Sequence, residues 1–136
     1  MTPHRVLLVE DDPLEATLAR RTLLQIDKDL DIIRLRDGAH FLQYYKDNRP
    51  VKDVSLAIMD LHMPRVDAFA VLRIFQKNDE RCPFPIVMFS SSEDQEEIDL
   101  AYDLGATAFV SKPTAPKAYR AAMRGIVDFW VKTNRR

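Results

Sequence analysis

The sequence has few of the residues that create disulfides, thiolate metal sites or glycine-rich loops. Its single cysteine, Cys82, excludes an internal disulfide and a cysteine-rich metal site, and we expect an unreactive thiol there. None of the three glycines lies between residues 9 and 15, which excludes the glycine-rich phosphate loops of dinucleotide-binding and P-loop proteins. Lysine and arginine number 20 against 21 acidic residues, and this balance disfavours a dedicated nucleic-acid binder.

Long hydrophobic segments are also absent. No apolar run approaches the roughly 20 residues that span a bilayer, and the stretch before Glu10 is too short for a secretion signal. The 136 residues, 46% hydrophobic and 30% charged, are typical of one globular domain. We therefore expect a single cytoplasmic domain that spans 1–136, with a core of about 5–130, no membrane partner and no output domain after residue 136.

Five short apolar runs recur along the chain. Most of them lack polar alternation, which suits strands that are buried on both faces of a sheet. They are Val6–Val9, Leu30–Leu35, Leu56–Met59, Ile86–Phe89 and Ala108–Val110.

Each run is followed by a segment whose apolar residues have helical spacing. The stripes comprise Leu14, Leu18, Ala19, Leu23 and Ile26; Ala39, Leu42 and Tyr45; Ala68, Leu72 and Phe75; Ile98, Ala101 and Tyr102; and Ala118, Ala122, Ile126 and Phe129. Strands that alternate with such helices pair in parallel through right-handed crossovers. The sequence therefore predicts an α/β fold with helices on both faces of the sheet.

Several helix ends can be placed from the sequence. Asp12, Pro13 and Glu15 fit an N-cap, a first helical proline and a capping-box partner. Asp67 is expected to cap the third helix, and Gly105 suits a left-handed cap after the fourth.

Polar side chains follow the predicted strands where each one ends. In open parallel sheets, ligands bind beyond these carboxyl ends. The residues there are Glu10, Asp11 and Asp12; Asp37; Asp60; Ser90, Ser91 and Ser92; and Lys112. Carboxylate oxygens suit Mg²⁺, a carboxylate can accept a phosphoryl group, and a lysine can stabilise the transferred oxygens.

Each of these residues also has an ordinary structural explanation. Asp12 alone is explained by helix capping, Ser90 by an N-cap of the fourth helix, and Lys112 by surface charge. Their joint occurrence at one edge of the sheet favours a functional site.

The ordered motifs resemble the receiver domain of two-component response regulators. The matching pieces are Val9-Glu10-Asp11-Asp12, Met59-Asp60-Leu61-His62-Met63-Pro64, Phe89-Ser90-Ser91 and Lys112-Pro113. Ser90 follows Asp60 by 30 residues and Lys112 follows it by 52, which fits the family spacing. The resemblance implies a doubly wound, flavodoxin-like (βα)5 sheet with strand order 2-1-3-4-5.

The resemblance also implies a role for each matching residue. Asp60 corresponds to the phosphoacceptor, and the Mg²⁺ ligands would be Glu10, Asp11, Asp60 and the backbone carbonyl of His62. The residues that bind the phosphoryl group or switch with it would be Ser90, Ser91, Lys112 and the aromatic Phe109. The bond before Pro113 is expected to be cis.

Two residues depart from the family pattern. Alanine stands at position 68, eight residues after the acceptor, where the family usually has glycine. If that turn needs a positive φ, Ala68 is strained. Ser91 replaces the commoner alanine, which would narrow access to the phosphoryl group.

The last helix carries a second apolar stripe, Tyr119, Met123, Val127 and Trp130. One stripe suffices for docking on the sheet, so the second is a candidate dimer interface. We expect a homodimer through the fourth helix, the fifth strand and the last helix, with a wide core face as the alternative.

Further short motifs are similar to regulators that are paired with phytochrome photoreceptor kinases. They are Gly125-Ile126-Val127-Asp128-Phe129-Trp130, Arg36-Asp37-Gly38 and Phe41-Leu42. The resemblance thus implies a phosphorylation switch that receives its phosphoryl group from a sensor histidine kinase. The switch signals to a downstream protein and is not an enzyme in its own right. The alternatives are a receiver-fold binding module that is never phosphorylated, and a Mg²⁺-dependent phosphohydrolase.

Overall fold

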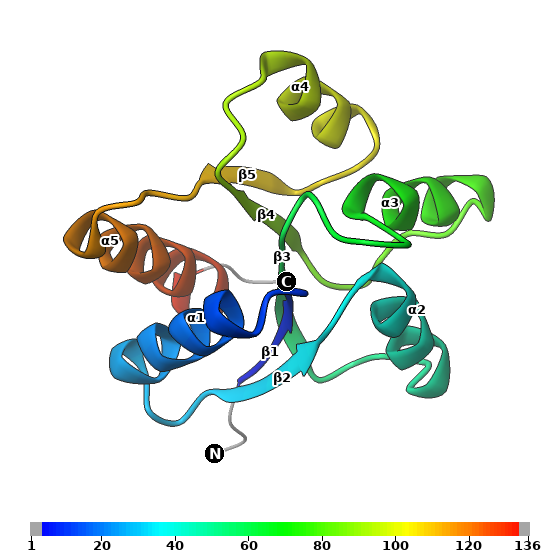
Figure 1. The fold of residues 1–136 in the computed structure, drawn as a ribbon. Coiled ribbons are helices and arrows are strands. Elements are labelled where there is room, and N and C mark those ends of the chain that lie inside the picture. The colour runs from blue at the N-terminus through cyan, green and yellow to red at the C-terminus, as the bar shows by residue number, and fades with distance from the viewer. Residues whose placement is uncertain (1–3, 134–136) are drawn as a thin grey trace.

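The computed structural model describes residues 4–133, which form one parallel sheet between two layers of helices (Figure 1). The predicted span 1–136 includes residues 1–3 and 134–136, which lie outside the described residues. Strands and helices alternate. In chain order they are β1 (Arg5–Val9), α1 (Pro13–Ile26), β2 (Asp31–Leu35), α2 (Gly38–Asp47), β3 (Val54–Met59), α3 (Ala68–Lys77), β4 (Ile86–Ser90), α4 (Gln95–Asp103), β5 (Ala108–Ser111), α5 (Pro116–Ile126) and the π-helix η1 (Val127–Thr133).

The strand order is β2-β1-β3-β4-β5, and every neighbouring pair is parallel. This confirms the predicted doubly wound fold. Four of the five apolar runs lie wholly within strands. The remaining run, Leu30–Leu35, begins one residue before β2. A single order reversal at β1 and β3 places their carboxyl ends next to each other, where such folds bind ligands.

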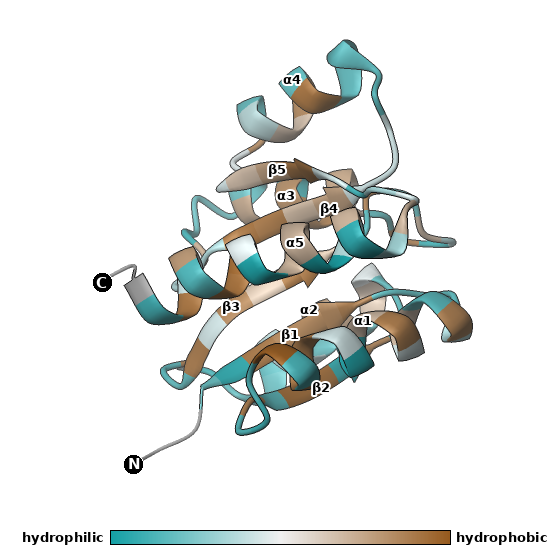
Figure 2. Ribbon diagram, turned by 90° about the vertical axis from the view of Figure 1, so that its left-hand side faces the viewer, coloured by the Kyte–Doolittle hydropathy of each residue, from teal (hydrophilic) through white to brown (hydrophobic). Residues whose placement is uncertain are grey.

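Each face of the sheet packs against its own helices. Leu7 and Val9 of β1 join the core beneath α2, α3 and α4, whereas Val6 and Leu8 join the core beneath α1, α5 and η1. All four side chains are at most 3% exposed. Burying one such side chain contributes roughly 1.5–3 kcal/mol. Figure 2 shows the strands mostly in hydrophobic colours, between helices that carry both hydrophobic and hydrophilic residues. No helix among residues 4–133 is long and apolar enough to cross a membrane.

The predicted caps of two helices are confirmed, as is the left-handed glycine. Asp12 accepts a hydrogen bond from the Leu14 amide at 2.9 Å, and Asp67 accepts one from Ala70 at 2.9 Å. Gly105 follows α4 with a φ of +106°, a conformation that favours glycine. Ser90 is not the N-cap of α4, because Asp94 occupies that position and accepts from the Glu96 amide.

Two expectations for α1 were wrong. Glu15 is not the capping-box partner of Asp12, since its carboxylate binds Lys112 at 2.9 Å. Leu14 and Leu18 were expected to face the core but are 81% and 48% exposed. The helix instead packs through its smaller residues and one leucine, namely Ala16, Ala19, Thr22 and Leu23.

The stripe of the last helix that was assigned to a dimer interface is mostly core, which corrects that prediction. Tyr119, Met123 and Val127 are at most 7% exposed and pack against the sheet, while Trp130 is half-buried. Tyr119 lies 5.5 Å from the Phe89 ring, between centroids. The physical reason is size, because these bulky side chains fill the space above the sheet better than alanines do. The other stripe of this helix, which was expected to dock on the sheet, contains an exposed alanine at 118 and Phe129, which is 51% exposed.

Gly38, the first residue of α2, lies against the loop that follows β3. Its amide donates to the Val66 carbonyl at 2.9 Å. A Cβ atom at this position would lie only 2.3 Å from that carbonyl oxygen. Glycine therefore permits the close approach of α2 to the loop between β3 and α3.

We predict that Gly38→Ala lowers the free energy of unfolding by about 1–3 kcal/mol, because the new methyl group overlaps backbone atoms. Gly125→Ala is the matched control, since its Cβ would have no neighbour within 4 Å. In that helix position, alanine should raise stability by about 0.5–1 kcal/mol. Urea denaturation of both variants measures the difference. Equal stabilities would contradict the importance of the Gly38 contact.

Candidate functional site

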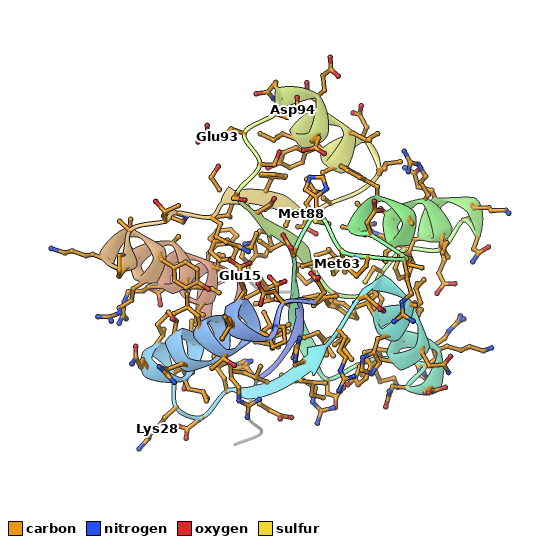
Figure 3. The ribbon with its side chains drawn as sticks, viewed as in Figure 1. Glu15, Lys28, Met63, Met88, Glu93 and Asp94 are labelled. Atoms are coloured by element: carbon orange, nitrogen blue, oxygen red, sulfur yellow. The ribbon has the colours of Figure 1, made fainter. Side chains whose placement is uncertain are left out.

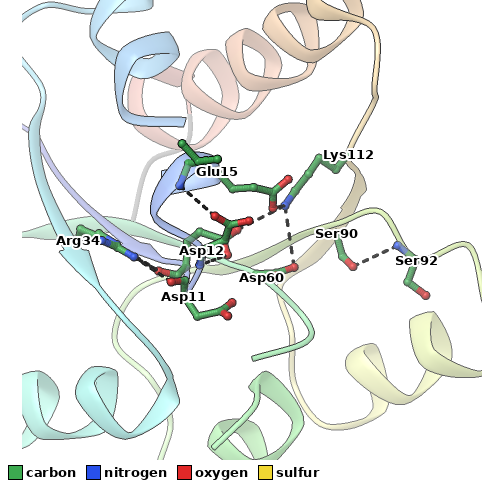
Figure 4. Close-up of polar contacts among 10 residues, drawn as sticks. Asp11, Asp12, Glu15, Arg34, Asp60, Ser90, Ser92 and Lys112 are labelled. Carbon is green, nitrogen blue, oxygen red and sulfur yellow. Dashed lines mark hydrogen bonds and ion pairs between the residues drawn. The ribbon is translucent and has the colours of Figure 1, made fainter. Parts of the chain in front are cut away.

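The carboxyl edge of the sheet brings together residues from four strands. Main-chain hydrogen bonds carry the ladder past the strand ends, from Asp60 to Val9 at 3.0 Å and from Lys112 to Ser90 at 2.8 Å. Figure 4 shows the acidic side chains, Ser90 and Lys112 around this edge. The sheet register thus places residues that are up to 102 positions apart in the sequence within contact distance.

Three carboxyl groups form the centre of the site. The carboxylate oxygens of Glu10, Glu15 and Asp60 lie within 4.8 Å of one another. Burial, and then the charges of Asp60 and Glu15, raise the pKa of Glu10 to about 7, against opposing effects of the Asp12 amide and Lys112. Burial also raises the pKa of Asp60. The cluster therefore concentrates negative charge that water cannot fully solvate.

Lys112 is the cation that faces these acids. Its ammonium nitrogen is 2.9 Å from Glu15, 3.5 Å from Glu10 and 4.0 Å from Asp60. Burial lowers the pKa of Lys112, but the hydrogen bond to Glu15 and the charges of the three acids outweigh it, so the pKa is raised. Lys112 therefore stays protonated and offsets part of the negative charge.

The loop that carries the first acids is held from two sides. The Arg34 guanidinium on β2 donates to the Glu10 carbonyl at 3.0 Å and to the Asp11 carbonyl at 3.1 Å. The Asp12 amide donates to the Glu10 carboxylate at 3.1 Å. The Arg34 bonds thus hold the main chain of this loop, and the Asp12 amide orients the Glu10 carboxylate.

The residues fit a magnesium ion, and receiver domains bind Mg²⁺ in an acidic pocket of this kind. Carboxylate oxygens are the ligands that hard divalent cations prefer, and a cation would relieve repulsion among the three acids. Asp11 is not part of the compact trio, although its charge reaches Asp60 and raises that pKa. Sequence reasoning missed Glu15, whose position in the first turn of α1 was the available signal.

The serines lie on the β4 side of the site. Ser90 is 2% exposed, and its hydroxyl oxygen accepts from the Ser92 amide at 3.2 Å. The Ser92 hydroxyl donates to Glu97 of α4 at 2.6 Å. Ser91 is exposed to solvent. A hydrogen-bonded chain therefore runs from the buried serine to the fourth helix.

His62 and Phe109 lie at the margin of the site. The His62 imidazole is exposed and contacts Glu97 at 3.0 Å, on the side of α4. Phe109 is half-buried against the core, and its amide donates to the Tyr102 hydroxyl at 3.0 Å. A metal contact from the His62 carbonyl and a rotamer change of Phe109 stay predictions.

The prediction of a cis peptide bond before Pro113 is wrong. Among the described residues, the structure has its cis peptide bond between Arg49 and Pro50. The Lys112–Pro113 bond is trans, the isomer that X–Pro bonds favour by about 0.5–1 kcal/mol. With this trans bond, Lys112 reaches all three acids of the site.

The loop after Asp60 has an anchor that sequence reasoning did not identify. Arg65, with a φ of +65°, pairs with Asp37, a buried residue at the start of α2. A hydrogen bond from the His40 amide, together with Arg65, holds the pKa of Asp37 below its usual value. Strain at Ala68 is not found, because that residue has no positive φ and is fully buried in the core. The left-handed turn falls three residues earlier.

The fold and these side chains define a doubly wound domain with a partly buried aspartate beside a cation site, a serine and a lysine. A model of the family described as response regulator receiver domain matches residues 6–124. The chain belongs to this family.

Relatives match nearly the whole chain. This chain is 28% identical over 134 residues to response regulator Rcp1 of Synechocystis sp., and the match covers 96% of this chain and 91% of Rcp1. The structure of the Mn²⁺-bound form of Rcp1 has a TM-score of 0.80 at 26% identity, covering 98% of each chain. The bacteriophytochrome response regulator AtBRR has a TM-score of 0.71 at 30% identity, covering 98% of this chain and 99% of that one. Several longer curated relatives are matched over about half their length.

The raised pKa of Glu10 predicts a pH-dependent stability of the metal-free protein. Because folding raises this pKa from 4.5 to about 7, the stability it contributes is present below pH 4.5 and lost as pH rises through about 7. We expect the free energy of unfolding to fall by about 1–3 kcal/mol between pH 5 and pH 8. Urea denaturation in a chelator measures it.

Glu10→Gln should reduce this loss, because the glutamine stays neutral throughout. Glu96→Gln, at an exposed position on α4, should keep the wild-type dependence. An unchanged pH dependence in Glu10→Gln would show that Glu10 does not carry the effect.

Proposed function

We propose that this receiver domain is a phosphorylation switch that accepts a phosphoryl group on Asp60 from a sensor histidine kinase. The observation that carries the proposal is the position of Asp60, a partly buried carboxylate at the end of β3 with Lys112 at 4.0 Å and Glu10 beside it. Here a nucleophile, a stabilising ammonium and a cation site converge on one point.

In the proposed transfer, an Asp60 carboxylate oxygen attacks the phosphorus of a phosphohistidine. The oxygen–phosphorus bond forms while the phosphorus–nitrogen bond breaks, and the kinase histidine keeps that electron pair. Glu10 and Asp60, with Asp11 nearby, would hold Mg²⁺, which when bound neutralises charge on the transferred oxygens. Lys112 donates hydrogen bonds to the phosphoryl oxygens from within the site.

The change on Asp60 reaches the surface through Ser90 and α4. The phosphoryl group carries about two negative charges in place of the single charge of the Asp60 carboxylate, and Ser90 can donate its hydroxyl hydrogen to it. When the Ser90 hydroxyl donates to the phosphoryl group, the hydrogen bond that it now accepts from the Ser92 amide changes. Ser92 in turn donates its hydroxyl to Glu97 of α4. The binding face for a downstream protein is therefore α4 with β5, where the Tyr102 hydroxyl and the Phe109 amide are joined.

The similarity to Rcp1 and AtBRR supports a phytochrome-type photoreceptor kinase as the donor. AtBRR is described as a bacteriophytochrome response regulator, and the similarity extends over nearly the full length of both chains. The switch would act in the cytoplasm, as a signalling protein whose only chemistry is its own phosphorylation and dephosphorylation.

The protein incubated with Mg²⁺ and a small phosphodonor such as acetyl phosphate should gain the mass of one phosphoryl group. Asp60→Asn and a chelated sample should not gain it, because they lack the nucleophile and the cation. Intact-protein mass spectrometry measures the product. Asp103→Asn, an exposed residue at the end of α4, is the matched control and should be phosphorylated like wild type.

Each alternative function has its own signature in this experiment. Phosphorylation of Asp60→Asn would place the acceptor elsewhere. No mass gain, from acetyl phosphate or from a phytochrome-type kinase, would favour a binding module that is never phosphorylated. Multiple turnovers of a generic phosphate ester would favour a phosphohydrolase.

We also expect a homodimer through α4, β5 and α5. Tyr102 of α4 is 47% exposed, and Trp130, in η1 directly after α5, is half-buried. Tyr102→Arg should shift the mass measured by light scattering toward the monomer. Leu14→Arg, at an exposed position on α1, should leave the mass unchanged. A monomeric mass of the wild type at micromolar concentration, with and without phosphodonor, would contradict the dimer.

A further inference from the structure

Glu15 is the closest partner of Lys112, yet the family pattern gives it no role. We propose that Glu15 is a positioning residue that holds Lys112 in the unphosphorylated state and competes for it with the phosphoryl group on Asp60. This inference rests on the proposed function of Asp60 as acceptor. In the resting protein, Lys112 must then leave the Glu15 carboxylate to reach the phosphoryl group on Asp60. We call the contact between Glu15 and Lys112 the latch.

The distances favour Glu15 over the other two acids. The ammonium nitrogen is 2.9 Å from the Glu15 carboxylate, which is a hydrogen bond, but 4.0 Å from Asp60. Figure 3 shows Glu15 pointing from α1 to the middle of the molecule, whereas Lys28 beyond the same helix points outward at the rim. Lys112 is therefore held on the α1 side of the site, away from the atom that would be phosphorylated.

Exposure makes the Glu15 contact easy to release. The Glu15 side chain is 46% exposed, against 6% for Glu10 and 16% for Asp60. When Lys112 leaves, water can solvate the Glu15 carboxylate, whereas Glu10 has almost no access to water. Glu15 is thus the acid that can give up the lysine at the lowest cost in solvation.

The surroundings fix both ends of the latch. Asp12 and Pro13 set the first turn of α1, which places Glu15. The cavity at the ammonium has a volume of only about 10 Å³ and is lined by the three acids, by Lys112 itself and by core side chains that include Tyr119 and Phe89, so it leaves little free space around the lysine. The ammonium can therefore move from Glu15 toward Asp60 only by a short shift within the site, in which Glu10 stays within reach at 3.5 Å.

The latch predicts that Glu15→Gln favours the phosphorylated conformation. Beryllofluoride, a stable mimic of the phosphoryl group, would be titrated into the full chain at fixed Mg²⁺ and followed by amide NMR signals. We expect Glu15→Gln to bind it about three- to tenfold more tightly, as loss of a partly exposed ion pair implies. Glu15→Asp should retain most of the wild-type affinity, and Glu96→Gln, in the exposed first turn of α4, all of it.

A second background separates the latch from simple charge repulsion. If Glu15 acts through the lysine, Glu15→Gln should give no gain in a Lys112→Ala protein. A gain that persists there would assign the effect to repulsion between Glu15 and the bound anion and overturn the latch. In metal-free protein, Glu15→Gln should also shift the NMR signal of the Lys112 ammonium, because its nearest partner is lost.

The remaining outcomes are equally decisive. Unchanged beryllofluoride affinity in Glu15→Gln would overturn the inference, as would weaker binding of both Mg²⁺ and beryllofluoride, which would make Glu15 a metal ligand. Failure of the wild type itself to bind beryllofluoride at Asp60, with Asp60→Asn as reference, would instead contradict the proposed function.

Discussion

The arrangement of the site depends on one ammonium group among three carboxylates. Two of these acids, Glu10 and Asp60, are largely withdrawn from water, and this burial, followed by the charge of Asp60, raises the pKa of Glu10 to about 7. Lys112 keeps them together without neutralising them. The residual negative charge attracts a divalent cation, and the same lysine is available to an incoming phosphoryl group. Affinity for the cation and readiness for phosphorylation therefore have a common electrostatic origin.

The rest of the fold serves to keep this charge in place. Arg34 holds the main chain of the acidic loop from β2, and the Arg65–Asp37 pair anchors the loop after Asp60 to α2. Both guanidinium groups act on backbone or helix-end geometry and not on the reacting atoms. The acids are thus held by contacts that are already in place without a cation, as in a preorganised site.

Much of the fold follows from local patterns in the sequence. The strands are short runs of branched apolar residues, and Asp12 and Asp67 mark helix starts because their side chains bond only the nearest amides. The face that a helix buries is harder to infer, as Leu14 and Tyr119 illustrate. Leu14 is apolar but exposed, and Tyr119 belongs to a stripe that was assigned to a dimer interface but fills the core. Such choices depend on the volume between helix and sheet, which no local pattern encodes.

The site was predictable where residues follow strand ends, and not where they come from elsewhere. Asp60 and Lys112 could be assigned because parallel strands bring their carboxyl ends to one edge. Glu15 was missed, because its position in the first turn of α1 also fits a helix cap, and the contact with Lys112 depends on the orientation of α1. The pairing of Arg65 with Asp37 was missed for a similar reason, since it spans two loops.

The contact between Gly38 and Val66 has a consequence for how this sequence can vary. Because α2 begins directly on the carbonyl of the loop after β3, the number of residues between Asp60 and α3 is tied to the absence of a side chain at position 38. An insertion in that loop would move Val66 and release the constraint on residue 38, while a larger residue there would require a different loop path. Loop length and the glycine are therefore sterically coupled, so that a change in one is tolerated only with a change in the other.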